Sequence, residues 1–198
     1  MIDLSIEWRR EQPLRRQASE KSMLNIVQAE TPEQIATARE LMVEYATRLG
    51  VDLCFQGFEE EMRVLPGKYA PPSGRLLLAL WDGESAGVIA LRPMGEKTEG
   101  LCEMKRLFVR PEFRGHGIGR ILAERIIAEA LEIGYKRMRL DTMPGKMDSA
   151  IAMYRELGFA ETEPYYKTPV SQTLFMELAL DSRVQAKPAL HHGDKAGK

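Results

Sequence analysis

The chain has 198 residues and a formal net charge of −1 at neutral pH, with 44% apolar and 29% charged residues. This length favours one domain, the balanced charge argues against nucleic-acid binding, and no apolar run approaches the ~18 residues that a membrane span needs. The two cysteines, Cys54 and Cys102, lie far apart, which fits a reduced protein better than a disulfide framework. Because the N-terminus lacks the apolar stretch of a signal peptide, we expect a cytoplasmic protein.

Both ends of the chain lack the apolar periodicity of a folded domain. Residues 1–23 are charge-rich and are expected to form a flexible arm. Residues 181–198 are rich in Lys, His, Gly and Pro and are expected to form a disordered tail. Within the tail, His191 and His192 have no carboxylate or Cys at ligand spacing, so they do not indicate a metal site. The folded domain is therefore expected to span residues 24–180.

The first predicted elements are a strand and two helices. A short apolar stretch, Leu24–Gln28, predicts the strand. The tetrapeptide Thr31–Gln34 then combines an N-cap, a proline at the first helical position and the glutamine of a capping box. Apolar residues recur at helical spacing after it until Gly50, which ends the helix. A second, shorter helix is expected over Phe58–Leu65.

Three strands are predicted next. Arg75–Trp81 and Ala86–Arg92 flank the turn residues Asp82–Ser85, which is a pattern typical of a β-hairpin. A polar loop, Pro93–Gly100, is expected to lead to another strand at Cys102–Val109. We expect this last strand at the centre of the sheet, with Cys102 as a small buried side chain.

The stretch after the central strand is a glycine-rich turn that leads to a helix beginning at Arg120. The turn contains two arginines and three glycines: Arg110, Arg114, Gly115, Gly117 and Gly119. Glycine has no Cβ, so its backbone can adopt unusual angles and a ligand can approach it closely. The first N–H groups of a helix have no intrahelical partner, and the helix dipole attracts anions to them. We therefore expect the turn to bind an anion such as a pyrophosphate.

A glycine-rich turn before a helix also occurs in two common phosphate-binding motifs. A P-loop is excluded, because no Gly-Lys-Ser/Thr follows. The Rossmann pattern requires a third glycine where this chain has Ile121 and Leu122. An ordinary helix start and a different nucleotide-phosphate site both stay open on these residues alone.

The remaining predicted elements complete a mixed α/β pattern. The helix ends near Gly134, a strand follows at Arg137–Thr142, and a further helix at Asp148–Leu157 ends before a glycine. Two closing strands are expected at Phe159–Glu161 and Gln172–Leu180. The resulting order, β-α-α-β-β-β-α-β-α-β-β, predicts one mixed sheet with helices on both faces.

Two motifs resemble the GNAT superfamily of acyl-CoA-dependent N-acyltransferases. Residues 114–119, Arg-Gly-His-Gly-Ile-Gly, match its Arg/Gln-x-x-Gly-x-Gly/Ala signature, and residues 150–159 resemble its A-x-x-x-Y-x-x-x-G-F helix end. The resemblance covers residues 24–180 and implies an α/β fold with a mostly antiparallel sheet that splays after its fourth strand. It also implies an N-acetyltransferase that uses acetyl-CoA and an amine in a ternary complex, without a metal.

The resemblance assigns residues to acetyl-CoA. The pyrophosphate is expected at the helix start, and the backbone at the end of the central strand is expected to bind the pantetheine and the thioester oxygen. The implied binding residues are Leu107, Phe108, Val109, Arg114, Gly115, His116, Gly117, Ile118, Gly119 and Arg120. Met147 stands where the family often has an asparagine that can hydrogen-bond the pantetheine, so this contact would be lost or would move to Asp148 or Ser149.

The resemblance also names two catalytic candidates. Tyr154 is implied as the acid that protonates the CoA thiolate, since a phenol of pKa ~10 can do so; a core tyrosine is the alternative. Glu103 lies where some family members carry a catalytic glutamate, so it is the candidate base. A salt bridge to Lys105 or Arg106 is the alternative for Glu103, and many family members use water chains instead of one base.

The amine site is less defined by the sequence. Tyr165 and Tyr166, in the loop before the last strand, are the candidate substrate residues, while Glu60, Glu61 or Tyr69 could also reach the amine. We expect a small-molecule amine or an amino acid rather than a protein amine. A CoA-binding sensor without catalysis is the alternative from another class, and a homodimer is possible.

Overall fold

The computed structural model describes residues 22–51, 57–95 and 99–180. Within these ranges the strands are β1 (Leu24–Gln28), β2 (Arg75–Trp81), β3 (Glu84–Met94), β4 (Leu101–Val109), β5 (Arg137–Thr142), β6 (Ala160–Glu161) and β7 (Leu174–Ala179). The α-helices are α1 (Pro32–Leu49), α2 (Phe58–Arg63), α3 (Ile118–Ile133) and α4 (Asp148–Glu156). The predicted order of helices and strands is confirmed. The predicted arm and tail lie outside the described residues, except for Ser22 and Met23.

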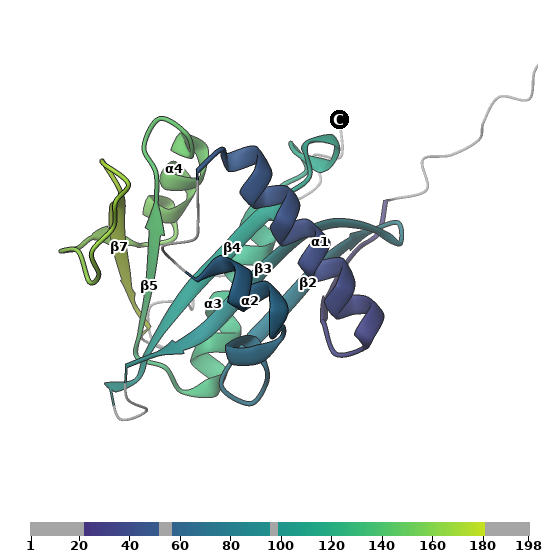
Figure 1. Cartoon of the computed structure of the whole chain (residues 1–198), viewed down its shortest axis with the longest axis horizontal. Helices are drawn as coiled ribbons and strands as arrows, with labels where there is room; N and C mark the ends of the chain where they lie inside the picture. The colour runs from purple at the N-terminus through teal and green to yellow at the C-terminus, as the bar shows by residue number, and fades with distance from the viewer. Residues whose placement is uncertain (1–21, 52–56, 96–98, 181–198) are drawn as a thin grey trace, which may run out of the picture.

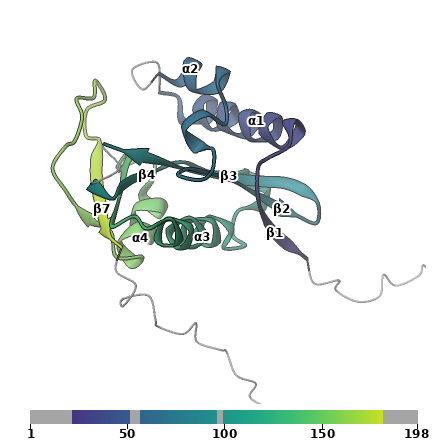
Figure 2. The same cartoon turned by 90° about the horizontal axis from the view of Figure 1, so that it is seen from below.

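The described strands form one seven-stranded sheet between two layers of helices. The strand order is β1-β2-β3-β4-β5-β7-β6, and only β4 and β5 are parallel. Figure 2 shows α1 and α2 on one face of the sheet and α3 and α4 on the other. These features confirm the predicted fold class, a mixed α/β fold with a mostly antiparallel sheet.

The sheet splays between β4 and β5. The two strands pair only where Leu101–Glu103 meets Arg137–Arg139, and beyond these residues they diverge (Figure 1). A bulge in β4 lies in the separated part, where Arg106 has a φ of +60° and the register with β3 shifts. Because a bulge adds a residue to one strand and increases its twist, it helps to separate β4 from β5. The predicted splay after the fourth strand is confirmed.

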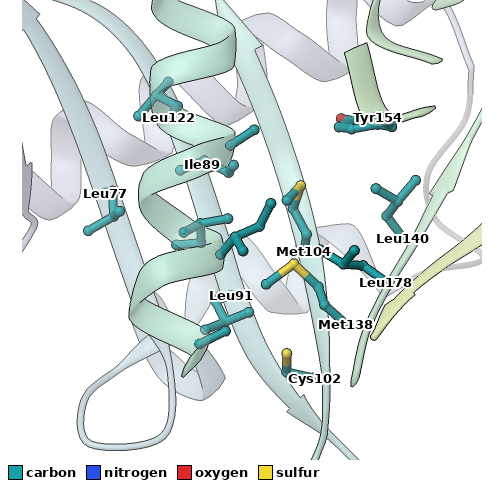
Figure 3. Packing of buried hydrophobic residues seen from close by; sticks show 14 of the residues in the cluster. Leu77, Ile89, Leu91, Cys102, Met104, Leu122, Met138, Leu140, Tyr154 and Leu178 are labelled. Carbon is teal, nitrogen blue, oxygen red and sulfur yellow. The ribbon is translucent and has the colours of Figure 1, made fainter. Parts of the chain in front are cut away.

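The core lies in two layers, one on each face of the sheet. One layer packs the sheet against α3 and α4, and Figure 3 shows part of it, including Leu77, Ile89, Met104, Leu122 and Met138. Cys102 also belongs to this layer and is fully buried, as predicted. The second layer packs α1 and α2 against the opposite face, with Leu41, Met42, Leu76, Leu78 and Phe108 among its members. Burial on both faces places β3 and β4 at the centre.

Local sequence signals explain several boundaries. Thr31 and Gln34 form the predicted capping box at the start of α1, and Gly50 ends the helix with a left-handed φ of +62°. Asp82 and Gly83 have φ angles of +51° and +86°, which suits a tight hairpin between β2 and β3.

Other boundaries differ from the prediction. Pro93, expected in a loop, continues β3 opposite Cys102, because pairing with β4 extends to Met94. α3 begins at Ile118, two residues before the predicted start, because Gly117 forms its N-cap. α2 is shorter than expected, and a 3₁₀ turn at Gly67–Tyr69 follows it.

Candidate functional site

A large cleft opens where β4 and β5 separate. Its volume is about 770 Å³, and it is lined by the end of β4, the glycine-rich turn, the start of α3 and residues of α4. Nine of the predicted binding residues line it: Leu107, Phe108, Val109, Arg114, Gly115, Gly117, Ile118, Gly119 and Arg120. The fold therefore places the predicted residues at the end of β4 and those of the glycine-rich turn around one cleft.

The other predicted binding residue, His116, packs elsewhere. Its ring lies against Trp81 of β2, with 4.7 Å between the ring centroids. His116 thereby anchors the turn to the sheet.

The glycine-rich turn gives the cleft an open backbone surface. Gly115 and Gly117 have φ angles of +84° and +76°, and a Cβ at either position would meet no atom within 4 Å. No side chain caps the first N–H groups of α3. These N–H groups and the helix dipole make the start of α3 suitable for binding an anion.

Cationic side chains surround the same cleft. Four of them line it, together with one acid: Arg48, Arg114, Arg120, Lys146 and Glu156. Arg114 donates to the Val109 carbonyl at 3.1 Å, and Lys146 donates to the Leu49 carbonyl at 2.8 Å. This excess of positive charge favours a polyanionic ligand.

Two of the arginines near the turn are held by acidic residues. Arg120 forms an ion pair with Glu156 across the cleft. Arg110 turns toward α1, where it pairs with Glu44 at 2.8 Å and donates to Ser85. Arg110 is therefore an anchor between the turn and α1. Arg48, which pairs with the same Glu44 at 2.9 Å, and Lys146 are cleft cations that the sequence did not indicate.

A smaller cavity adjoins the cleft on the β4–β5 side. Its volume is about 40 Å³, and the two spaces share Tyr45, Leu49, Leu107 and Met147 in their walls. Tyr45 comes from α1, and its place in the walls of both spaces makes it a functional candidate. Tyr45 lines both spaces only because α1 packs beside the separated ends of the strands, which the sequence does not reveal.

Tyr154 lines the smaller cavity. The side chain, labelled in Figure 3, is 4% exposed. Its ring lies 5.7 Å from that of Phe159. Burial raises the pKa of the Tyr154 phenol, with smaller contributions from Tyr45 and Asp141. The phenol is therefore protonated at neutral pH, and the raised pKa makes it a weaker acid than an exposed tyrosine.

Glu103 occupies a buried ion-pair network on the α1–α2 side of the sheet. It is 1% exposed and lies 2.6 Å from Arg92 and 3.6 Å from Lys105. Tyr165 donates a hydrogen bond to it at 3.2 Å. Glu103 is not among the residues that line the cleft or the smaller cavity, so its role as a base stays a prediction.

The two predicted substrate tyrosines are placed differently. Tyr166 lines the smaller cavity, whereas Tyr165 packs against Phe175 and binds Glu103. Burial by itself raises the pKa of Asp141. Lys105, the Tyr166 hydroxyl and Arg106 lower it by a larger amount, so the pKa of Asp141 lies below its usual value. Asp141 therefore stays ionised in the cavity wall.

The acidic candidates of α2 are engaged in ion pairs. Glu61 pairs with Arg106 at 2.7 Å and accepts a hydrogen bond from Tyr69 at 2.9 Å. Glu60 pairs with Arg63 at the surface. None of Glu60, Glu61 and Tyr69 is among the residues that line the two spaces.

Met147 lines both spaces, and its sulfur accepts a weak hydrogen bond of 3.5 Å from Thr142. Of the two neighbours that could replace an asparagine there, Ser149 lines the cleft. The Asp148 carboxylate instead accepts a hydrogen bond of 2.7 Å from the Gly145 N–H.

Two features are absent from the described part of the chain. No cluster of three or more His, Cys, Asp or Glu side chains that could hold a metal ion occurs in residues 22–51, 57–95 and 99–180. Among the same residues, no helix combines the length and apolarity that crossing a membrane requires.

Comparison with known proteins agrees with this geometry. Residues 37–159 match the family model "Acetyltransferase (GNAT) family". An uncharacterised N-acetyltransferase from Schizosaccharomyces pombe is 37% identical over 160 residues, which cover 80% of this chain and 96% of that protein.

Solved structures share the fold at low sequence identity. A GNAT-family acetyltransferase from Staphylococcus aureus has a TM-score of 0.65 and 20% identity, with 80% of this chain and 100% of the other covered. The protein yncA from Salmonella typhimurium, solved with its cofactor acetyl-CoA, has a TM-score of 0.56 and 21% identity, with 81% of this chain and 96% of the other covered.

Proposed function

Because the chain belongs to the GNAT family of acetyltransferases, we propose that it transfers the acetyl group of acetyl-CoA to the primary amine of a small molecule or amino acid. The observation that carries the proposal is the cleft at the β4–β5 splay, where a cationic, glycine-lined helix start meets the end of a strand. The alternatives are a CoA-binding sensor without catalysis and an acetyltransferase for protein amines.

The residues of the cleft fit acetyl-CoA. The open backbone at Gly115 and Gly117 and the start of α3 would hold the pyrophosphate, with Arg114 and Lys146 adding charge. The backbone of Leu107–Val109 lies beside the splay, where β4 has no partner on the β5 side. Its polar groups would bind the extended pantetheine and stabilise charge on the thioester oxygen.

Acetyl-CoA supplies the acetyl thioester, and the amine must be deprotonated before it attacks. The amine nitrogen forms a bond to the carbonyl carbon while the carbon–sulfur bond breaks. The thiolate takes a proton, so an ammonium and acetyl-CoA give an amide, free CoA and one released proton. In this proposal both substrates are bound together, and no acetyl group is transferred to the protein.

Two side chains are proposed for the proton transfers. Tyr154 is the acid for the thiolate, because its phenol lies in the smaller cavity and stays protonated. For the proton of the ammonium, Glu103 is the proposed base. Because Glu103 does not line the smaller cavity, Lys105, which does line it and lies 3.6 Å from Glu103, would lie between Glu103 and the amine.

The experiment that tests the proposal is calorimetric titration of acetyl-CoA into Gly117→Glu. A glutamate at this position places a side chain and a negative charge at the helix start, so acetyl-CoA binding should be lost. The matched control is Gly83→Glu, because Gly83 also has a positive φ (+86°) and open space but lies in the β2–β3 hairpin. Both variants carry similar backbone strain.

The outcomes separate the alternatives. Loss of binding in Gly117→Glu but not in Gly83→Glu supports the proposed site. Unchanged affinity in both variants would contradict it. Binding without thiol release for any amine would favour the sensor.

A further inference from the structure

The smaller cavity lies at the inner end of the cleft, where an amine could meet an acyl group. It is bounded by Met104–Leu107 of β4 and by Leu140–Thr142 of β5, the parts of these two strands that do not pair with each other. Tyr45 and Met147 belong to the walls of both spaces. A ligand in the cavity would therefore be next to a ligand in the cleft.

The charged groups in the cavity wall are two cations and one carboxylate. Lys105 and Asp141 are 5% and 15% exposed, and Lys105 Nζ lies 2.8 Å from Asp141 Oδ1. Arg106 is 3% exposed and donates two hydrogen bonds to Glu61, at 2.9 and 2.7 Å. The wall thus presents positive and negative charge side by side.

The surrounding ion pairs make this group neutral as a whole. Arg92, Lys105 and Arg106 are balanced by Glu61, Glu103 and Asp141. A neutral group with separated charges suits a ligand that is itself neutral and dipolar, because each ligand charge finds an opposite charge and no excess charge is buried.

We propose that the acceptor is a small zwitterionic amino acid, with its ammonium beside Asp141 and its carboxylate beside Lys105 and Arg106. This inference rests on the proposed function. The ligand carboxylate would contact Lys105 and Arg106 in addition to their present partners, Asp141 and Glu61. The ligand ammonium would contact Asp141, which also stays bound to Lys105. The amine nitrogen then loses its proton and attacks as described above.

The same contacts discriminate against polyamines and aminoglycosides. A second ammonium group would bury an excess positive charge beside a group that is already neutral, and Asp141 is the one carboxylate among the described residues that line the cavity. Glu60 and Glu61 do not line the cavity, so they offer no further carboxylate to a second ammonium.

The volume of the smaller cavity also favours a small amino acid. A cavity of about 40 Å³ has room for about three water molecules. This space fits the compact atoms of an α-amino acid with a small side chain.

The experiment compares acceptors that differ only in the carboxylate. Thiol release from acetyl-CoA is measured with alanine against ethylamine and with serine against ethanolamine, and spermidine represents the polyamines. The expected kcat/KM for each amino acid is about a hundredfold higher than for its partner, as a charge-assisted contact predicts. Equal or faster reaction of ethylamine, ethanolamine or spermidine overturns the inference.

Lys105→Gln tests the assigned contact. The alanine-to-ethylamine ratio should fall about tenfold, mainly through KM for alanine, and differences in amine basicity cancel between variants. Arg63→Gln is the matched control, because it removes an exposed cation of α2 that lines neither space. An unchanged ratio in folded Lys105→Gln overturns the contact, and if this variant fails to fold, the substrate pairs still decide the inference.

Acetyl-CoA titration separates this inference from the proposed function. If acetyl-CoA does not bind and no acceptor reacts, both fail. If acetyl-CoA binds and only amines without a carboxylate react, the proposed function stands and the zwitterionic acceptor is wrong.

Discussion

The Tyr165 hydroxyl donates a hydrogen bond of 3.2 Å to Oε1 of Glu103, which ties the loop before β7 to the centre of the sheet. Arg92 binds Oε2 of the same carboxylate at 2.6 Å. Glu103 is therefore held by two separate parts of the chain. Removing its charge should affect folding as well as any proton transfer.

Glu103→Gln should lower the free energy of unfolding by about 3 kcal/mol, because it removes the carboxylate that pairs with Arg92 and leaves Lys105 with Asp141 alone. Urea denaturation measures this change. The control is Glu177→Gln, whose carboxylate is 23% exposed and pairs with Arg139, and which should cost about 1 kcal/mol or less. Unchanged stability with a hundredfold loss of kcat would show that Glu103 acts chiefly as a base.

Tyr154→Phe should lower kcat by about 10²–10⁴ while leaving the Kd of acetyl-CoA within about twofold, because the ring remains and only the proton donor is lost. Tyr135→Phe is the control. Tyr135 is also buried, but its hydroxyl donates to the Ser73 carbonyl at 2.7 Å, and it lines neither space. Full kcat in Tyr154→Phe would assign this tyrosine to the core alone.

Lys146→Gln should weaken acetyl-CoA binding about tenfold, because it removes one charge from the cleft wall. Lys136→Gln, a change of an exposed lysine just beyond the C-terminal end of α3, should have no effect. Affinity should also fall as ionic strength rises, and less steeply in Lys146→Gln. Identical salt dependence in the two variants would remove Lys146 from the binding surface.

Alkaline pH should destabilise the fold through Tyr45. Burial raises its pKa from 10.0 to about 12, so the folded state resists loss of the phenol proton that the unfolded state permits. The contribution to stability is fully present below pH 10 and is lost as pH rises from 10 to about 12. Urea midpoints across this range should fall less steeply in Tyr45→Phe. Parallel curves would contradict the assignment.

Local signals in the sequence determined much of this protein. The capping box at Thr31, the hairpin at Asp82–Gly83 and the order of strands and helices follow from backbone preferences and apolar spacing, which act over a few residues. The glycine-rich turn and the Tyr154 motif predicted the family and most of the cleft. The cytoplasmic location and the homodimer stay predictions.

Only the tertiary structure decided which side chains share a space. Tyr45, Arg48 and Lys146 come from α1 and from the segment before α4, and no local pattern relates them to the glycine-rich turn. The pairing of Lys105 with Asp141 likewise depends on how β4 and β5 lie after they separate. Local preferences along the chain specify helices and strands, but contacts between distant residues depend on how these elements pack. The charges in the wall of the smaller cavity arise only from that packing.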